Sequence, residues 1–312
     1  MKPTSLHLLL SFQCSRECDH CFVWGSPFQR GTMTGETVKN VLDQAKEMGH
    51  VERVSFGGGE PFLHYPVMLS SVRMAARLGF RVGVTTNAYW AASESDCAEW
   101  LGPLAGLIEN LTISSDWYHW EADLKQHVRN ACAVGRDLGI AARVRSVVFP
   151  GCMDDERDPQ IVESPVEYRG RASVELAPDA PQVSWLEFKS CKCGDLRDPE
   201  EVQIDPYGNV HVCEGIAVGN LLKRPLSEIC HDYEPDLHSV IGPLIQGGPV
   251  ELVLRYGLDH KKYYADACHA CYDARLALRG RFPDILTPDQ LYGVKRELDP
   301  LGNLSAGVES ET

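Results

Sequence analysis

The sequence predicts an α/β fold through its first half and a cysteine-rich module after it. Three observations lead to this prediction: strand-like and helix-like segments alternate regularly over residues 5–149, the composition changes after Pro150, and cysteines recur between residues 191 and 271. Strands that alternate with helices pair in parallel under a helical cover, so we expect a barrel or a doubly wound sheet. In both, the chemistry gathers at the carboxyl ends of the strands.

The first elements are plain in the sequence. Residues 5–12, SLHLLLSF, form a short apolar run that is typical of a buried strand. Residues 34–49 carry apolar side chains at helical spacing, with Thr34 as a candidate N-terminal cap and Gly49 as the end. Residues 51–56, VERVSF, are the next strand, and they run directly into three glycines.

The same alternation continues as far as residue 149. The segments are helix 65–79, strand 80–87, helix 93–105, strand 108–116, helix 121–139 and strand 140–149. Residues 151–182 are rich in Asp, Pro and Glu and have weak periodicity, which predicts a linker and a last strand of the sheet. The tail from residue 299 is polar, and we expect it to be disordered.

Composition excludes several classes of partner. The net charge of −14 argues against nucleic acid and anionic membranes as partners. No apolar run approaches the roughly 20 residues of a membrane span, and the N-terminus lacks the features of a signal peptide, so we expect a cytoplasmic protein. Twelve cysteines in a reducing compartment then favour metal binding or redox work over disulfides.

Cys14, Cys18 and Cys21 follow the first predicted strand, within eight positions of one another. Thiolates are soft ligands that suit iron–sulfur clusters, and a cluster of four irons held by three protein ligands leaves one iron open for another molecule. Two other interpretations remain: incidental buried cysteines, or a zinc site with His20 or His7 as fourth ligand.

The second predicted strand ends in SFGGGEPFLH, residues 55–64. Glycines allow a ligand to approach the backbone closely, and Glu60 adds a carboxylate that suits a ligand ammonium. The simpler interpretation is a tight turn between a strand and a helix.

Together, the two motifs resemble those of the radical S-adenosylmethionine enzymes, over residues 5 to 150. That family has C-x-x-x-C-x-x-C after the first strand and G-G-E-P after the second, here Cys14, Cys18 and Cys21, and residues 58–61. The resemblance implies a partial (β/α)6 TIM-like barrel. It also implies a 4Fe-4S cluster on the three cysteines, whose open iron binds the amino and carboxylate groups of S-adenosylmethionine.

The resemblance also implies contacts to S-adenosylmethionine. Gly58, Gly59 and Glu60 would hold its ammonium group, and His20 stands where an aromatic residue usually lies near the adenine. Polar residues at the ends of the third and fourth strands would contact the ribose and carboxylate: Thr86, Asn87, Ser114 and Asp116. The alternative for these last four is that they are capping residues.

The second module resembles the auxiliary-cluster domains called SPASM and Twitch. Fourteen residues separate Cys193 from Gly208 and four separate Gly208 from Cys213, around a predicted hairpin. With Cys268 and Cys271, Cys193 and Cys213 would hold a second, fully ligated 4Fe-4S cluster of the shorter Twitch type. Cys191 competes with Cys193 as a ligand, and a structural zinc on Cys191, Cys193, Cys268 and Cys271 is the alternative.

The expected organisation is therefore a core with linker over residues 1–182, an auxiliary module over 183–298 and the tail at 299–312. Cys97 and Cys132 are expected to be small buried side chains in helices. Cys152 and Cys230 are hypothetical hydrogen-atom donors to a substrate. Residues 116–121, DWYHWE, either face the barrel mouth or anchor a packed loop.

On this resemblance, we expect an enzyme that cleaves S-adenosylmethionine reductively to a 5′-deoxyadenosyl radical, which takes a hydrogen atom from a substrate C–H bond. The electron would come from a flavodoxin- or ferredoxin-type donor. The auxiliary cluster would carry an electron, as in an oxidation.

The substrate is not named by any residue. Because the cysteine loop begins at residue 14, no room is left for the leader-binding extension of many peptide-modifying relatives. We therefore expect dehydrogenation or epimerisation of a small polar molecule, such as an amino-sugar or a natural-product intermediate. Maturation of a ribosomally made peptide is the alternative, and a non-catalytic zinc or iron–sulfur binding or assembly protein is the alternative of another class.

Overall fold

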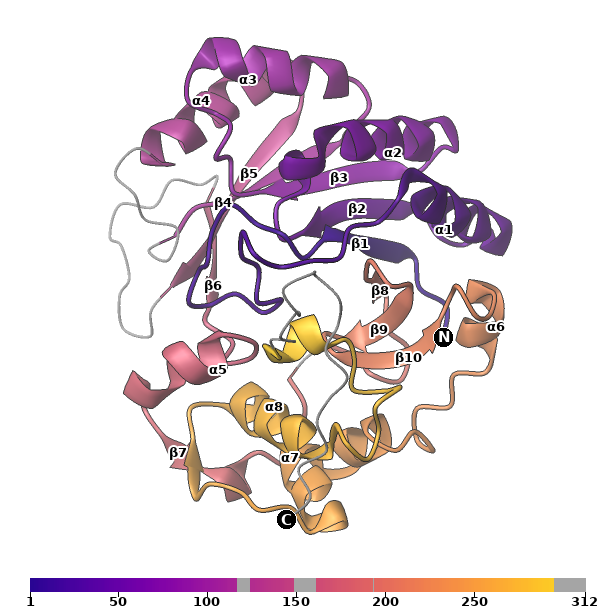
Figure 1. Ribbon diagram of the computed structural model, residues 1–312, viewed down its shortest axis with the longest axis vertical. Helices are drawn as coiled ribbons and strands as arrows, with labels where there is room; N and C mark the ends of the chain where they lie inside the picture. The colour runs from indigo at the N-terminus through magenta and orange to yellow at the C-terminus, as the bar shows by residue number, and fades with distance from the viewer. Residues whose placement is uncertain (117–123, 149–160, 193, 295–312) are drawn as a thin grey trace, which may run out of the picture.

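The computed structural model describes residues 1–116, 124–148, 161–192 and 194–294 (Figure 1). Within them the main sheet has nine strands, in the spatial order β10-β9-β8-β1-β2-β3-β4-β5-β6. The strands are β1 (Ser5–Ser11), β2 (Arg53–Gly58), β3 (Arg81–Thr86), β4 (Asn110–Ser114), β5 (Ala141–Val148), β6 (Ile161–Pro165), β8 (Glu201–Ile204), β9 (Asn209–Cys213) and β10 (Ile216–Asn220).

Strands β1 to β6 pair in parallel, each with the next. The helices between the first five are α1 (Gly35–Met48), α2 (Tyr65–Arg77), α3 (Glu94–Leu101) and α4 (Leu124–Asp137). Figure 1 shows these four helices on the outer face of a curved sheet. Helices on one face of a curved parallel sheet make a partial barrel, so the predicted α/β fold is confirmed and the doubly wound alternative is wrong.

The predicted element boundaries agree closely with the observed ones. Helix α1 begins after Thr34, whose side chain accepts a hydrogen bond from the backbone of Thr37, and it ends at Gly49 in the left-handed conformation. The last strand predicted in residues 151–182 is β6. Residues 299–312 lie outside the described residues, and so do 117–121 of the DWYHWE segment.

The strands of the barrel alternate between two kinds of side chain. On β2 to β5 the buried apolar residues face the outer helices, for example Val54, Phe56, Val84 and Leu111. Alternate positions point the other way and carry polar or charged side chains, such as Arg145. Successive side chains of a strand point to opposite faces. One face therefore builds the core while the other lines the inside of the barrel.

The predicted hairpin after residue 200 is confirmed, since β8 and β9 are antiparallel. Its strand β8 also pairs in parallel with β1, with Ser5 opposite Glu201, so the hairpin extends the barrel sheet. Val202, Ile204 and Val210 of the hairpin pack into the same core as the barrel strands. The sheet thus continues across the boundary that was predicted at residues 182 and 183, and that boundary stays a prediction.

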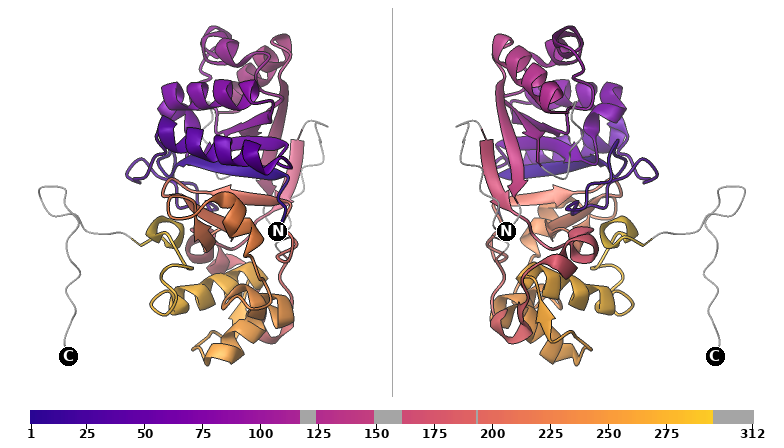
Figure 2. Two further views of the ribbon diagram at one scale, coloured as in Figure 1. Left: turned by 90° about the vertical axis from the view of Figure 1, so that its right-hand side faces the viewer. Right: turned by 90° about the vertical axis from the view of Figure 1, so that its left-hand side faces the viewer.

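The rest of the second half supplies further helices and a small sheet. It contains α5 (Ala172–Glu175), α6 (Leu226–His231), α7 (Ile241–Tyr256), α8 (Ala267–Leu278) and a small sheet of β7 (Val183–Ser184) and β11 (Tyr263–Tyr264). Figure 2 shows α7 and α8 at the opposite end of the molecule from α3 and α4. These helices build a second core that also takes in Leu9 and Phe12 from β1 and the residues after it.

The turn of the β8–β9 hairpin depends on Asp205, whose side chain is fully buried. Its carboxylate accepts hydrogen bonds from the backbone N–H groups of Tyr207 and Asn209, at 2.8 and 3.0 Å. The other oxygen lies 3.0 Å from His211 Nε2. The turn therefore relies on one side chain for several buried polar groups.

We expect Asp205→Ala to lower the free energy of unfolding by about 3 kcal/mol, because it leaves buried hydrogen-bond donors without an acceptor. Urea unfolding followed by circular dichroism measures the change. The matched control is Asp259→Ala at an exposed position, expected to change stability by less than about 0.5 kcal/mol. Equal effects of the two substitutions would contradict the role of Asp205.

Candidate functional site

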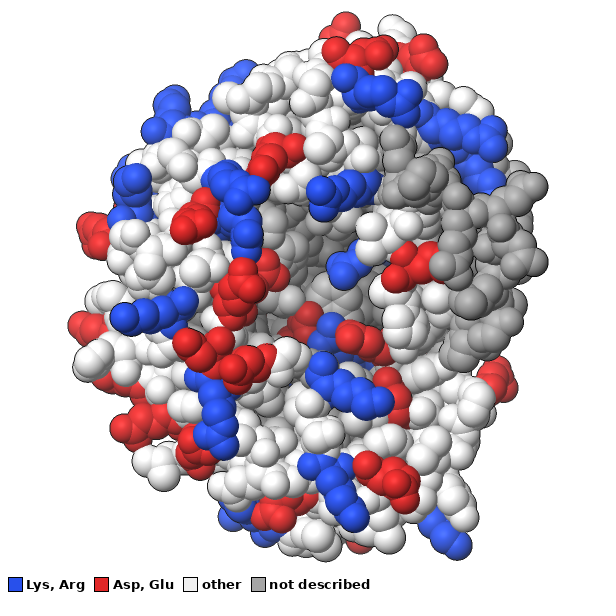
Figure 3. Space-filling view, turned by 180° about the vertical axis from the view of Figure 1, so that it is seen from behind, with Lys and Arg blue, Asp and Glu red and all other residues white. Residues whose placement is uncertain are grey.

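A cavity of about 680 Å³ lies on the inner face of the barrel sheet. It is lined by the carboxyl ends and inner faces of the parallel strands and by the cysteine loop that follows β1. Figure 3, which shows the face opposite to that of Figure 1, has a hollow near its centre that is bordered by side chains of both charges. The cavity therefore lies where the sequence predicted the chemistry to gather.

The three cysteines of the loop all line this cavity: Cys14, Cys18 and Cys21. Two of their sulfurs already accept hydrogen bonds, Cys14 Sγ from Asn87 Nδ2 at 3.5 Å and Cys21 Sγ from the backbone N–H of Gly25 at 3.2 Å. Hydrogen bonds of this kind are typical of cysteine sulfurs that hold iron–sulfur clusters.

The three thiols also lie within electrostatic reach of one another. Burial raises the pKa of Cys14 to about 12, with a further contribution from the charge of Glu60. Burial also raises the pKa of Cys18, and the neighbouring Cys21 and Cys14 raise it further. Thiolates that repel one another in a buried place need a cationic centre among them. These residues therefore fit an iron–sulfur cluster.

The loop is fastened to the end of β2 by backbone hydrogen bonds. The N–H of Gly59 donates to Ser11 O at 2.6 Å, and the N–H of Glu60 donates to Gln13 O at 2.8 Å. A Cβ on Gly59 would lie 2.1 Å from Gln13 O, and one on Gly58 would lie 2.4 Å from Ser11 O. The chain's own backbone thus occupies the space that these two glycines leave.

A residue that follows β6 in the chain also holds the cysteine loop in place. Arg171 is buried, and its guanidinium donates to the carbonyl oxygens of Cys18 at 2.7 Å and Gly25 at 2.8 Å. Its backbone N–H donates to Cys21 O at 2.9 Å. Arg171 therefore holds the backbone of the cysteine loop at three points, a role that its sequence position did not suggest.

Glu60 is fully buried, and its side chain is absent from the cavity lining described here. Its carboxylate accepts hydrogen bonds from Thr86 Oγ1 at 2.8 Å, Asn87 N at 2.7 Å and Phe62 N at 3.0 Å. It thereby joins the end of β2 to the end of β3 and begins the short 3-10 helix Pro61–His64. The ammonium contact predicted for Glu60 stays a prediction.

Thr86 and Asn87 make local hydrogen bonds like those of capping residues, and their contact with S-adenosylmethionine stays a prediction. Thr86 Oγ1 accepts hydrogen bonds from Trp90 Nε1 at 3.0 Å and from the backbone of Ala88 at 3.1 Å. Asn87 Oδ1 likewise accepts from the backbone of Tyr89 at 3.0 Å. Both residues nevertheless line the cavity, with Gly58 and Gly59 beside them.

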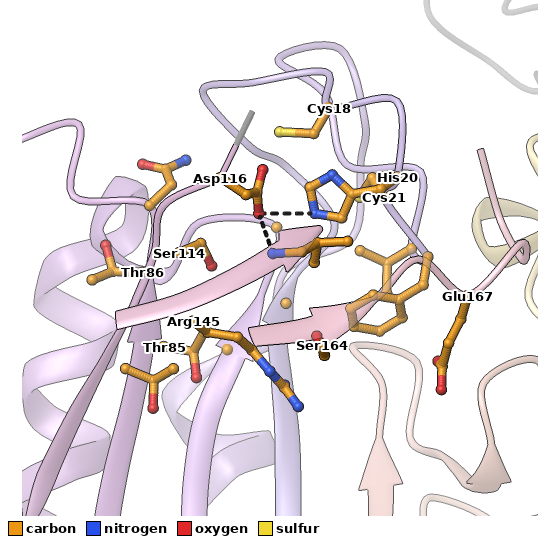
Figure 4. A pocket seen from close by; sticks show the side chains of 18 of the residues that line it. Cys18, His20, Cys21, Thr85, Thr86, Ser114, Asp116, Arg145, Ser164 and Glu167 are labelled. Atoms are coloured by element: carbon orange, nitrogen blue, oxygen red, sulfur yellow. Dashed lines mark hydrogen bonds and ion pairs between the residues drawn. The ribbon is translucent and has the colours of Figure 1, made fainter. Parts of the chain in front are cut away.

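His20 and Asp116 face each other across the cavity mouth (Figure 4). His20 Nε2 lies 3.7 Å from Asp116 Oδ2, and the Asp116 side chain is almost fully buried. Asp116 Oδ2 also accepts a hydrogen bond from the backbone of Val147 at 3.4 Å. The structure thus brings together two residues that the sequence analysis considered separately, next to Ser114 at the end of β4.

The charged residues of the inner face were not predicted from the sequence. Arg143 and Arg145 of β5 line the cavity, as do His7 of β1 and Glu201 and Gln203 of β8. Arg145 lies directly opposite Ser114 in the strand register. The signal was present, since polar residues at every second position of a predicted strand indicate a second, hydrophilic face.

Arg169 and Glu214 form a wall between this cavity and a second one. The Arg169 guanidinium pairs with the carboxylates of Glu214 and, at 2.6 Å, Glu167. Burial raises the pKa of Glu214, but the charges of Arg169 and Arg275 and hydrogen bonds from the backbone and Gln203 together outweigh it, so that the pKa lies below its ordinary value. Arg169 lines both cavities.

The second cavity is small and is lined by four cysteines of the second half: Cys191, Cys213, Cys268 and Cys271. Cys193, the predicted ligand, lies outside the described residues, so the choice between Cys191 and Cys193 stays open. Within the described ranges, no group of three or more His, Cys, Asp and Glu side chains is arranged to hold a single metal ion.

The spare cysteines have different surroundings. Cys97 is fully buried in the barrel core, as predicted, and Cys132 packs against that core. Cys230 is also buried there and does not line the described cavity, so its predicted role as a hydrogen-atom donor has no support from the geometry. Cys152 lies outside the described residues.

One electrostatic consequence of this site is open to measurement. Burial raises the pKa of Glu60 from 4.5 to about 7, although hydrogen bonds from Asn87, Phe62 and Thr86 oppose the shift. Between these values the folded chain binds more protons at Glu60 than the unfolded chain does. The stabilisation from this proton is complete below pH 4.5 and is lost as the pH rises through about 7.

Because glutamine does not titrate, Glu60→Gln should destabilise the apoprotein less at pH 8 than at pH 5, by about 2 kcal/mol. Urea unfolding at the two pH values measures the difference, with Glu47→Gln on the exposed face of α1 as the matched control. An equal cost of Glu60→Gln at both pH values would show that Glu60 is already ionised at pH 5.

Comparisons with known proteins agree with this geometry. The sequence profile of the Radical SAM superfamily matches residues 8–115. The putative peptide biosynthesis protein YydG of Bacillus subtilis is 27% identical over 120 residues, 38% of this chain and 38% of that protein. The tungsten-containing aldehyde ferredoxin oxidoreductase cofactor-modifying protein of Pyrococcus furiosus is 31% identical over 139 residues, 44% of this chain and 36% of that protein.

These matches span less than two-fifths of the length of both relatives. A solved structure, BtrN in complex with AdoMet and 2-DOIA, has a TM-score of 0.48 at 16% identity, covering 74% of this chain and 82% of that one. In the described residues, no helix is both long and apolar enough to span a membrane.

The matched segment contains the cysteine loop, the glycine turn and the ends of β3 and β4, which are the parts that meet at the barrel cavity. Over residues 8–115, this chain matches the radical SAM superfamily of enzymes.

Proposed function

We propose that this radical SAM enzyme abstracts a hydrogen atom from a small polar substrate bound inside the barrel, leading to its dehydrogenation or epimerisation. The observation that carries the proposal is the cavity itself, which has three cysteines at its mouth and a charged inner wall. A volume of about 680 Å³ lies within the range of pockets that bind small molecules.

S-adenosylmethionine and a 4Fe-4S cluster are the cofactors expected for the family, and Cys14, Cys18 and Cys21 would hold the cluster. When both cofactors are bound and the cluster is reduced, they supply a 5′-deoxyadenosyl radical able to remove a hydrogen atom from an unactivated C–H bond. The protein fixes the loop through Arg171 and the β2 turn, so that the three thiols stay on one side of the cavity.

The polar residues at the strand ends would orient S-adenosylmethionine. Arg145 lies opposite Ser114 in the register and has no ion-pair partner among the described residues, so its guanidinium is suited to a ligand carboxylate. Asp116 and His20 lie beside Ser114 at the mouth, where the ribose and adenine contacts were predicted. Gly58 and Gly59 line the cavity, where their backbone would contact the ammonium group.

The inner face of the barrel, which lines the cavity, is suited to a polar substrate. Arg143, His7 and Glu201 line the inner face and offer groups of both charges. Burial lowers the pKa of His7, although Glu201 and Glu214 oppose the shift, so the neutral imidazole is favoured. Charged walls bind ligands that carry complementary polar groups and exclude apolar ones.

Maturation of a peptide is the second candidate. The observation in its favour is the similarity to a relative described as a putative peptide biosynthesis protein. Assays with defined small molecules and with peptides distinguish the two kinds of substrate. In deuterated water, deuterium at the product carbon would indicate epimerisation. A product oxidised by two electrons would indicate dehydrogenation.

We also propose an auxiliary 4Fe-4S centre in the second cavity. Cys213, Cys268 and Cys271 would supply three of its thiolates, and either Cys191 or Cys193 the fourth. A fully ligated centre leaves no open iron for a substrate, so its role would be electron transfer. The electron donor to the first cluster, of flavodoxin or ferredoxin type, is part of the same proposal.

The first test is S-adenosylmethionine cleavage by anaerobically reconstituted protein. We expect 5′-deoxyadenosine after reduction with dithionite, and at least a hundredfold less from Cys18→Ala, because the cluster then lacks one of three ligands. Cys97→Ala, a buried cysteine of the barrel core, is the matched control and should keep the activity. Intact S-adenosylmethionine with wild-type protein would overturn the proposed reaction.

The second test decides the ligand set of the auxiliary centre. In a chain with Cys14, Cys18 and Cys21 all changed to Ala, we expect about four irons and four sulfides per chain. Adding Cys191→Ser or Cys193→Ser should remove this iron for one variant and retain it for the other, as read by iron analysis and absorption spectra. Bound zinc in place of iron would contradict the auxiliary cluster.

A further inference from the structure

Arg275 is an arginine buried beside the second cysteine cavity. It lies on α8, is 2% exposed, and lines that cavity together with Cys213 and Cys271. Arginine is almost never fully buried unless it is paired. Its position therefore requires a compensating group.

The described residues supply only part of that compensation. Arg275 Nη1 donates to the backbone carbonyl of Glu214 at 2.6 Å. The guanidinium lies over the rings of Tyr272 and Tyr292, at 5.5 and 5.8 Å from their centroids. Among the described residues, no carboxylate lies within ion-pair distance of Arg275, since Glu214 directs its own carboxylate to Arg169.

One hydrogen-bond donor of this buried guanidinium has no acceptor among the described residues. Arg275 Nε is buried and has no hydrogen-bond partner among the described residues. A buried donor without an acceptor and a buried charge without a counter-charge are both costly. Cation–π contacts and one carbonyl replace only part of the lost hydration. An anion next to Arg275 would satisfy both needs.

The acidic groups near this charge are cysteine thiols, the Tyr272 and Tyr292 side chains, and Glu214, whose carboxylate pairs with Arg169. Cys213, Cys268 and Cys271 line the same small cavity as Arg275. A centre bound by four thiolates carries a net negative charge, which a neighbouring guanidinium would balance. The structure therefore has a cation beside a set of thiols that becomes anionic on binding metal.

We propose that Arg275 is a positioning residue of the auxiliary iron–sulfur centre, balancing its negative charge and donating a hydrogen bond from Nε toward its sulfur atoms. The inference rests on the auxiliary centre of the proposed function. Positive charge and hydrogen bonds to sulfur raise the reduction potential of such centres. Arg275 therefore sets how readily the auxiliary centre accepts an electron.

The test measures the auxiliary centre by itself, in the full chain with Cys14, Cys18 and Cys21 changed to Ala. Redox titration followed by electron paramagnetic resonance gives its potential. We expect Arg275→Gln to disfavour reduction at least tenfold in equilibrium constant, about 59 mV for a one-electron couple. Arg275→Lys keeps the charge and should recover most of this difference.

Arg279→Gln is the matched control. Arg279 is the next arginine after Arg275 at the end of α8, lies over the same Tyr292 ring at 4.8 Å, and pairs with Asp289, but it does not line the cavity. Its substitution should leave the potential unchanged. A shift for Arg275→Gln that Arg279→Gln and Arg275→Lys do not share supports the proposal.

The remaining outcomes are also decisive. Loss of the centre from a folded Arg275→Gln chain, with retention in Arg275→Lys, supports charge balance. Equal potentials and equal iron content in wild type, Arg275→Gln and Arg275→Lys would overturn the inference while leaving the auxiliary cluster intact. Absence of four irons per chain in the parent with Arg275 unchanged would overturn the auxiliary cluster first, and the role of Arg275 with it.

Discussion

The site depends on one close contact, the backbone of the β2 turn against the start of the cysteine loop. Hydrogen bonds from Gly59 and Glu60 to Ser11 and Gln13 bring the two segments together, and the approach is too close for a Cβ at Gly58 or Gly59. Residues that are far apart in sequence thereby meet at the end of two neighbouring parallel strands. The ends of β3 and β4 complete the same edge, through the contacts of Glu60 and Asp116.

This contact also changes the interpretation of the glycine motif. From the sequence, glycines suggest room for a ligand, yet here their space is filled by the chain's own backbone. At Gly57 a side chain fills the space instead, because a Cβ there would lie 2.8 Å from the His7 ring. The motif therefore builds the site first by shaping the loop that carries the cysteines. Glu60 serves the same purpose through its buried hydrogen bonds.

The second half of the chain is joined to this site at several points. Strand β8 extends the barrel sheet, Arg171 holds the cysteine loop, and Trp24 Nε1 donates to Tyr272 OH at 2.9 Å. Tyr272 follows Cys271 directly, so the loop of the first cysteine group touches the helix of the second. Arg169 and Glu214 separate the two cavities. The two cysteine groups are therefore parts of one packed unit, although the sequence suggests separate modules.

The sequence by itself determined the alternation of strands and helices, the parallel sheet and the cysteine loop at its edge. Hydrophobic periodicity and local motifs record these features, since each depends on residues close together in the chain. Tertiary structure decided the rest: the polar inner wall with Arg145, the closing of the loop by Arg171, the burial of Arg275 and the exclusion of Cys230 from the cavity. These depend on contacts between residues distant in the chain, 153 positions apart for Arg171 and Cys18. An arginine has the same sequence signature on a solvated surface as in a buried site.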